Sequence, residues 1–182
     1  MKEAKLFVIS GPSGTGAADI IAEIFAERED VSSVMPITAR KMKAGETDGV
    51  GFRFFDLDGW NELKESGDLL EQTVFAGNDY GTSRKLVEEK LKAGKSVMLS
   101  IETARARQIK QNMPEAVCVY MSPSEGVLRE IYEKSARNWV EVNVRMEMAQ
   151  AQEKLADFAD ARICLDDPAC AKKELLKLID EE

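Results

Sequence analysis

The stretch of sequence that decides the fold is Ser10-Gly11-Pro12-Ser13-Gly14-Thr15-Gly16-Ala17-Ala18. Its glycines follow the spacing of G-x-x-x-x-G-K-[ST], the Walker A pattern, in which backbone amides surround phosphate groups. Gly11 and Gly16 occupy the positions that the pattern requires. Ala17 replaces its lysine, and Ala18 replaces its Mg²⁺-binding serine or threonine. The stretch thus keeps the backbone of a phosphate-binding loop but lacks two side chains that phosphoryl transfer from ATP normally uses.

The residues on either side of this loop carry the patterns of a strand and a helix. Residues 5–10 form a short β-rich run that leads directly into the glycines. Residues 17–29 place Ile20, Ile21 and Ile24 on one helical face. A strand, a glycine loop and a helix in this order are the context in which the phosphate-loop motif is meaningful.

Downstream of residue 83 the pattern alternates between helices and strands, which predicts a parallel sheet covered by helices on both faces. The expected fold class is therefore a three-layer α/β protein with a phosphate loop. Helices are expected over 83–93, 103–112, 124–135, 140–157 and from 168 onward, and strands over 96–101, 116–121 and 161–165.

Residues 32–82 interrupt this alternation and predict a small inserted lobe. A turn-rich segment, 43–49, is followed by an aromatic strand-like run over 52–55. A short helix over 60–65 and another strand over 69–75 follow. We expect one domain, with a core of about 1–31 and 83–182 and a mixed-β lobe of about 32–82.

Composition excludes several classes of function. The net charge of −8 argues against a nucleic-acid groove, and the absence of histidine removes histidine-based triads and histidine-ligated zinc, so no metal site is predicted. No apolar run is long enough to span a membrane and no signal peptide is recognised, which leads us to expect a cytoplasmic protein. Of the three cysteines, Cys118 and Cys164 lie in apolar runs and are expected to be buried thiols.

Several further segments fall in the order and spacing of one family, so that nearly the whole chain resembles guanylate kinases, which are P-loop nucleoside monophosphate kinases. Their glycine loop, basic lobe motif, strand ends and helical arginine all have counterparts here. The matching segments are Thr38-Ala39-Arg40-Lys41-Met42-Lys43-Ala44-Gly45-Glu46-Thr47-Asp48-Gly49, Glu71 with Gly77-Asn78-Asp79-Tyr80-Gly81-Thr82, Ser100-Ile101-Glu102, Arg145-Met146 and Asp166-Asp167.

The resemblance implies that the inserted lobe binds GMP. Glu71 matches the residue that reads the N1–H and 2-amino groups of guanine, and a carboxylate suits that edge because it accepts both donors. Lys43 replaces an arginine and loses the bidentate fork, and Phe52 replaces a tyrosine and loses its hydroxyl. The implied GMP site consists of Arg40, Lys43, Glu46, Phe52, Glu71, Tyr80, Thr82 and Glu102.

The side that would bind ATP is more altered. In a helical lid expected over about 125–145, Lys134 stands where the resemblance implies an arginine, Arg137 is placed to compensate, and Arg145 is retained. With Arg40, these residues are the implied catalytic cations. Because removing one preorganised donor typically costs about 10²–10³ in rate, we expect very weak or absent phosphoryl transfer. Mg²⁺ and ATP are cofactors only if kinase activity persists.

Three functions remain open from the sequence. The chain is a pseudoenzyme that binds GMP or another phosphate-bearing ligand, a module in which Arg40, Lys43 and Tyr80 grip a phosphorylated partner, or a working kinase with substitute cations. We expect a monomer or homodimer with no nucleic-acid or membrane partner.

Overall fold

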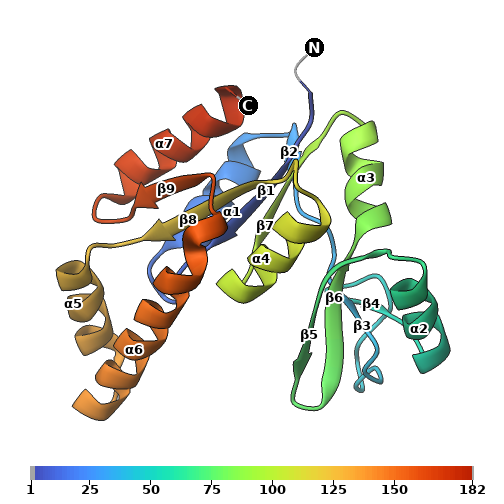
Figure 1. Ribbon diagram of the computed structural model, residues 1–182, viewed down its shortest axis with the longest axis horizontal. Helices are drawn as coiled ribbons and strands as arrows, with labels where there is room; N and C mark the ends of the chain where they lie inside the picture. The colour runs from blue at the N-terminus through green and yellow to red at the C-terminus, as the bar shows by residue number, and fades with distance from the viewer. Residues whose placement is uncertain (1–2, 182) are drawn as a thin grey trace.

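The computed structural model describes residues 3–181 and contains a parallel five-stranded sheet in the order β2-β7-β1-β8-β9 (Figure 1). Every pair of neighbouring strands in this sheet is parallel. The predicted α/β fold class is confirmed. The strands are β1 (Leu6–Ser10), β2 (Val31–Ser32), β7 (Ser96–Ser100), β8 (Val117–Ser122) and β9 (Ala161–Cys164).

The central strand β1 is buried on both faces, because successive side chains point to opposite sides of the sheet. Phe7 and Ile9 pack with the helices of one layer, and Leu6 and Val8 with those of the other. Both layers contribute apolar side chains to these clusters, which gives the three layers expected from the sequence. The first layer holds α1 (Ala17–Glu27) and α7 (Pro168–Glu181), and the second holds α3 (Arg84–Lys92) and α4 (Thr103–Asn112).

The inserted segment forms a second, mixed sheet in the order β4-β3-β6-β5, packed with helix α2 (Leu57–Glu65). Strands β3 and β4 are parallel, and the other neighbours are antiparallel. Trp60 of α2 is buried against this sheet. We call residues 32–82 the lobe; its limits as a separate unit stay a prediction. The strands are β3 (Ile37–Thr38), β4 (Arg53–Phe54), β5 (Leu69–Phe75) and β6 (Asn78–Ser83).

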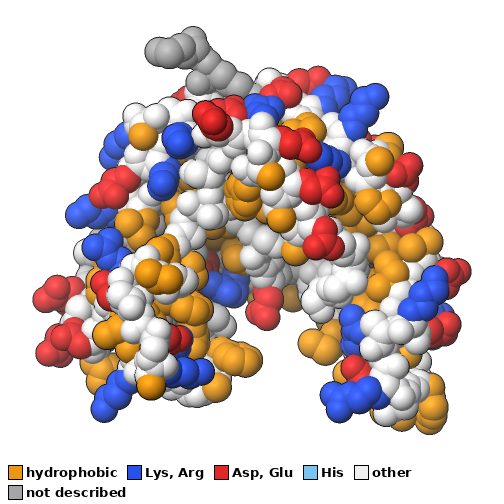
Figure 2. All heavy atoms as spheres, turned by 180° about the vertical axis from the view of Figure 1, so that it is seen from behind, with side chains coloured by type: hydrophobic (Ala, Val, Ile, Leu, Met, Phe, Trp, Pro, Cys, Tyr) orange, Lys and Arg blue, Asp and Glu red, His pale blue; other side chains and the backbone are white. Residues whose placement is uncertain are grey.

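Helices α5 (Glu125–Ser135) and α6 (Trp139–Leu155) form a helical hairpin with a hydrophobic cluster of its own. A short 3₁₀ helix, η1 (Ala156–Phe158), follows α6. The hairpin and the lobe project from the same side of the core sheet as two arms (Figure 1). Figure 2 shows the hollow between the arms from behind, with apolar side chains gathered on both of them. The buried residues of the hairpin cluster are Leu128, Tyr132, Val142, Met146 and Ala149.

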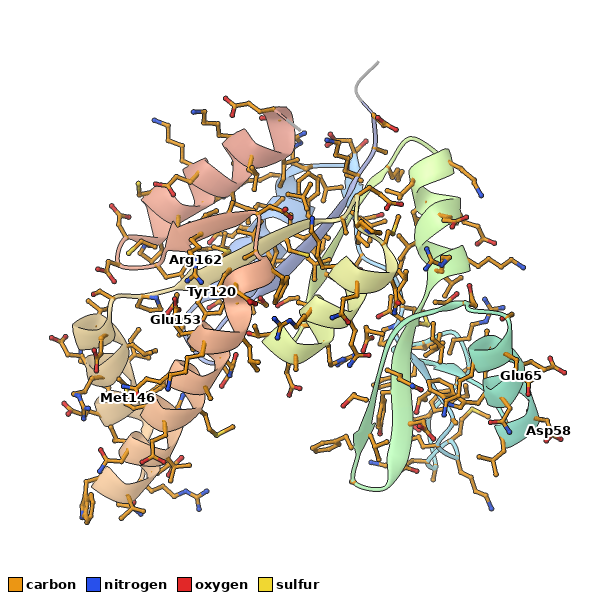
Figure 3. The ribbon with its side chains drawn as sticks, viewed as in Figure 1. Asp58, Glu65, Tyr120, Met146, Glu153 and Arg162 are labelled. Carbon is orange, nitrogen blue, oxygen red and sulfur yellow. The ribbon has the colours of Figure 1, made fainter. Side chains whose placement is uncertain are left out.

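The base of α6 is tied to the core sheet through Arg162 of β9. Its guanidinium hydrogen-bonds to the carboxylate of Glu153 and lies 5.2 Å from the centre of the Tyr120 ring. Figure 3 shows these three side chains together between β9 and the upper end of α6, with Met146 further out in the hairpin. The hairpin is therefore anchored at its base, and its tip extends beyond the sheet.

One expectation about the cysteines is wrong. Cys118 is buried in β8, as expected, but Cys164 is exposed. Strand β9 is at the edge of the sheet, and its alternating side chains bury Ile163 while Arg162 and Cys164 stay accessible.

Among residues 3–181, no helix is long and apolar enough to cross a membrane.

Candidate nucleotide-binding site

The glycine loop connects β1 to α1, and its backbone geometry explains its sequence. Gly11 has a φ of +154°, and a Cβ at this position would lie 2.0 Å from the carbonyl oxygen of Met121 in β8. Gly16 precedes α1 in the left-handed region, with a φ of +91°. Both positions therefore require glycine for steric reasons, whether or not a ligand binds.

The loop offers backbone donors to an anion. Among residues 3–181, none of the backbone N–H groups of residues 13–18 has a hydrogen-bond partner. The N-terminus of α1 adds the positive end of a helix dipole, which favours negative charge. A cavity of about 730 Å³ lies over the loop, and Glu102 and Gln152 form part of its wall. The loop can thus hold a phosphate group through its backbone alone.

The same loop fits Mg²⁺ poorly. Ala18 supplies no oxygen, and the hydroxyl of Thr15 donates to the carbonyl of Pro12 at 2.9 Å. Asp19 and Glu102 are acidic residues that line the cavity, but the described part of the chain holds no group of three Asp, Glu, Cys or His that could bind a metal. The loop therefore supplies fewer ligands to the Mg²⁺ of a bound nucleotide than a loop with the full Walker A pattern does.

Arg145 of α6 is the predicted cation that the structure brings to the loop. Its guanidinium lies 3.8 Å from the centre of the Tyr132 ring, and Nη1 donates to the Ser135 hydroxyl at 2.8 Å. Nη2 donates to the carbonyl of Ser13 in the loop at 3.5 Å, the outer limit for a hydrogen bond. Packing within the hairpin therefore orients Arg145 toward the position where a bound phosphate would lie.

The other two predicted lid cations are not brought to the loop. Lys134 lies 3.8 Å from the carboxylate of Glu130, and Arg137 lies 3.6 Å from that of Glu141. Both basic side chains are highly exposed, and neither lines the cavity over the loop. Exposed pairs of this kind contribute little to stability. Their proposed catalytic role stays a prediction.

A second cavity, of about 630 Å³, lies where the lobe meets the core sheet. Its size is in the range of small-ligand sites. Ser100 and Glu102 at the end of β7 line both this cavity and the one over the loop. Four of the predicted GMP-binding residues lie together in its wall: Phe52, Tyr80, Thr82 and Glu102.

Arg40 and Glu46, two members of the predicted GMP site, form a tight pair with each other. The two guanidinium nitrogens donate to the two carboxylate oxygens at 2.6 Å, and the backbone N–H of Lys43 adds a third hydrogen bond. The hydrogen bond from Arg40, followed by that from Lys43, lowers the pKa of Glu46 from 4.5 to about 2. Arg40 lies 5.3 Å from the centre of the Phe52 ring. Both Nη atoms of Arg40 are therefore already engaged by a carboxylate within the lobe.

Glu71 was predicted to face the guanine base, but it does not line the lobe cavity. Its side chain is 0% exposed, and both carboxylate oxygens are occupied by groups of the protein. Nε and Nη2 of Arg105 donate to them at 2.6 and 2.8 Å, and the Thr82 hydroxyl donates at 2.7 Å. Burial by itself lowers the pKa of Arg105, but the hydrogen bond and charge of Glu71 outweigh it and the pKa is raised.

Arg105 is the site residue that sequence reasoning missed. It lies on α4, within the helix predicted over 103–112, and 34 residues separate it from Glu71. The only sequence signal is a basic residue one turn after Glu102 in a helix that follows a strand end. Such a signal does not distinguish it from Arg107, which pairs with Asp157 on the surface.

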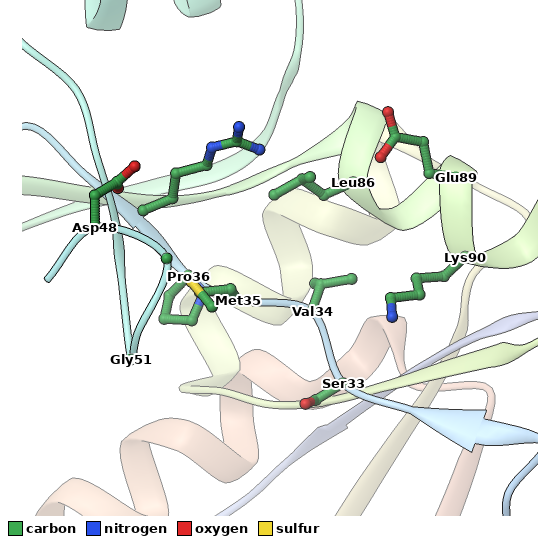
Figure 4. A pocket seen from close by; sticks show the side chains of 11 residues that line it. Ser33, Val34, Met35, Pro36, Asp48, Gly51, Leu86, Glu89 and Lys90 are labelled. Carbon is green, nitrogen blue, oxygen red and sulfur yellow. The ribbon is translucent and has the colours of Figure 1, made fainter.

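A further hollow, of about 570 Å³, lies on the other side of the segment that enters the lobe (Figure 4). Its wall contains Asp48, Arg53 and Lys90 but none of the predicted site residues. Asp48 accepts a hydrogen bond from the backbone of Phe54 at 2.7 Å. Asp48 of the basic lobe motif therefore has a structural role, since it fixes the turn before β4.

The chain has the features of P-loop α/β proteins, which are a parallel core sheet and a phosphate loop at the end of its central strand. It also has an inserted lobe, and a second cavity of a size for small ligands lies between this lobe and the end of β7. The guanylate kinase family model matches residues 3–182, and this chain belongs to that family.

Individual relatives agree with the family model. The guanylate kinase of Thermobifida fusca (strain YX) is 36% identical over 150 residues, which cover 81% of this chain and 76% of that protein. The guanylate kinase of Clostridioides difficile (strain 630) is 32% identical over 184 residues, which cover 100% of this chain and 90% of that protein. The crystal structure of guanylate kinase from Anaplasma phagocytophilum shares the fold with a TM-score of 0.66 at 22% identity, covering 100% of this chain and 87% of that one.

Proposed function

We propose that this chain binds a guanine-type nucleoside monophosphate between the lobe and the core, and that it transfers phosphate from ATP very slowly or not at all. The observation that carries the proposal is the contrast between two neighbouring cavities. The loop cavity has alanine at both positions where the Walker A pattern has polar side chains. The lobe cavity keeps Phe52, Tyr80, Thr82 and Glu102 in its wall.

Phosphoryl transfer depends almost entirely on positioning and on stabilising charge. Arg145 is the predicted cation that lies at the loop, and one arginine replaces neither the lysine nor the metal-binding hydroxyl. Loss of a single preorganised donor typically lowers kcat by about 10²–10³, and two absent groups acting as a unit lower it at least that much. Binding by the loop backbone does not require those side chains.

The second candidate is an active guanylate kinase with substitute cations. The names of the relatives favour it, since the matched proteins are called guanylate kinases. Arg145 at the loop also favours it, because a guanidinium neutralises transferring phosphate groups in other phosphoryl-transfer proteins. In this candidate Arg145 supplies much of the charge that the loop lacks.

GMP-dependent release of ADP from ATP with Mg²⁺ separates the two candidates. We expect a rate far below the ordinary kinase range of about 1–100 s⁻¹ for the wild-type chain. Restoring the loop with Ala17→Lys and Ala18→Ser should raise the rate by about 10²–10³ or more. Ala26→Lys, which adds a lysine to an exposed position at the other end of α1, should not.

The outcomes of this assay differ clearly. Ordinary turnover by the wild-type chain, unchanged by the two loop substitutions, would establish the active kinase instead. A calorimetric titration with GMP tests the binding half of the proposal, which fails if no heat of binding is detected at millimolar GMP.

A further inference from the structure

The wall of the lobe cavity differs from what the sequence predicts, because Glu71 is withdrawn from it. Thr82 and Arg105 line the cavity, and Glu71 lies behind them with a fully buried side chain. The three hydrogen bonds from these two residues take both carboxylate oxygens. A ligand in this cavity meets a guanidinium and a hydroxyl where a carboxylate was expected.

Arg105 uses only part of its donor set on this ion pair. Nε and Nη2 donate to Glu71, and Nη1 has no hydrogen-bond partner among residues 3–181. Arginine carries donors and no acceptor, so this group can bond to a carbonyl but not to an N–H or an amino group. Bidentate arginine–carboxylate pairs are among the stronger hydrogen-bonded contacts in proteins, which keeps the pair closed.

We propose that Arg105 sets the base specificity of the cleft by occupying Glu71. Guanine and hypoxanthine share the 6-oxo group and N1–H, and they differ only in the 2-amino group of guanine. With Glu71 held by Arg105, its carboxylate is not presented to the 2-amino group, and the Thr82 hydroxyl beside it offers only a neutral acceptor. The cleft therefore binds 6-oxopurine nucleoside monophosphates with or without that amino group nearly alike. This inference rests on the proposed function.

A guanine that reached Glu71 would first have to displace Arg105. It would break two charge-assisted hydrogen bonds and expose a buried pair before it formed its own contacts. The gain from the 2-amino group is offset by this loss. Arg105 is thus a specificity-determining residue that acts by positioning Glu71.

The test compares GMP and IMP binding to the full chain by calorimetry, with three proteins. For the wild type we expect Kd values within about threefold of each other, because the Glu71 carboxylate is not available to the 2-amino group. For Arg105→Ala we expect GMP to bind about tenfold or more tightly than before while IMP changes little, because a charged acceptor becomes accessible. Arg107→Ala removes an exposed arginine two residues along the same helix, and should keep the wild-type ratio.

Each outcome decides the question. A wild-type preference for GMP over IMP of about thirtyfold or more would overturn the role of Arg105 and leave the proposed function standing. An unchanged GMP-to-IMP ratio in a folded Arg105→Ala protein would overturn it too. If neither nucleotide binds to any of the three proteins, the proposed function and this inference fall together. If circular dichroism shows that Arg105→Ala does not fold, the wild-type ratio alone decides.

Discussion

The Arg105–Glu71 pair predicts an unequal response to removing either partner. The Glu71 side chain is 0% exposed and that of Arg105 is 19% exposed. Arg105→Met leaves a buried carboxylate with only the Thr82 hydroxyl, and we expect a loss of about 3–5 kcal/mol in the free energy of unfolding. Glu71→Leu leaves an arginine that can turn toward water in the cavity, so we expect a smaller loss of about 1–2 kcal/mol.

The double variant tests the physical reason for this asymmetry. Glu71→Leu with Arg105→Met replaces both charges by apolar groups of similar length, so neither buried charge is left without a partner. We expect its stability to lie within about 1 kcal/mol of the wild type, because an apolar pair of similar volume often replaces a buried ion pair without loss. The two single losses are therefore strongly non-additive.

Urea unfolding followed by circular dichroism measures all four free energies. Single domains typically have a total stability of about 5–15 kcal/mol, so a loss of this size is well resolved. Arg107→Met is the matched control, and its exposed ion pair with Asp157 should contribute less than about 1 kcal/mol. A cost below about 1 kcal/mol for Arg105→Met, or a double variant as unstable as the sum of the singles, would refute the reasoning.

Three further predictions concern other parts of the molecule. Burial raises the pKa of Cys118 from 9.0 to about 11, so alkylation of the native protein at pH 8 should label the other two cysteines, and mass spectrometry should find the third label only after denaturation. The pKa of Glu46 is lowered from 4.5 to about 2, so its pair with Arg40 stabilises the lobe fully above pH 4.5, and this stabilisation is lost as the pH falls through about 2. Acid unfolding of Glu46→Gln, followed by fluorescence, should therefore lack the loss of stability that the wild type shows in this pH range. Gly11→Ala places a Cβ against a backbone carbonyl and should cost about 3 kcal/mol or more in urea unfolding, whereas Gly126→Ala, in a helix with no atom within 4 Å of the new Cβ, should be neutral or stabilising.

Local sequence signals were sufficient for most of the core. The helix over 103–112 was predicted with the bounds that the structure shows. The helix predicted over 83–93 is α3, and Ser83 caps it by accepting a hydrogen bond from the N–H of Leu86. Strand β6 was not predicted, because its sequence is polar and contains Gly81. A Cβ there would lie 2.7 Å from the carbonyl of Glu71, so close strand pairing, a tertiary effect, determines the residue.

The site was less predictable, since its groups come from distant elements. The glycine spacing located the loop, and the resemblance to the family identified four residues that line one cavity. Which of the basic residues after position 133 faces the loop depends on how α6 packs on α5, and periodicity does not determine that face. The partner of Glu71 depends in the same way on the packing of α4 beside β5.

The α5–α6 hairpin carries a hydrophobic cluster of its own, and this has a mechanical consequence. We expect a unit with its own packed interior to move as one rigid body and not to bend along its length. Tyr132 and Ser135 hold Arg145 against the hairpin. Its distance from the loop is therefore set by the angle between the hairpin and the core sheet, at the contact of Glu153 with Arg162. Substitutions inside the cluster should therefore change the stability of the hairpin, whereas substitutions at its base should change the distance between Arg145 and the loop.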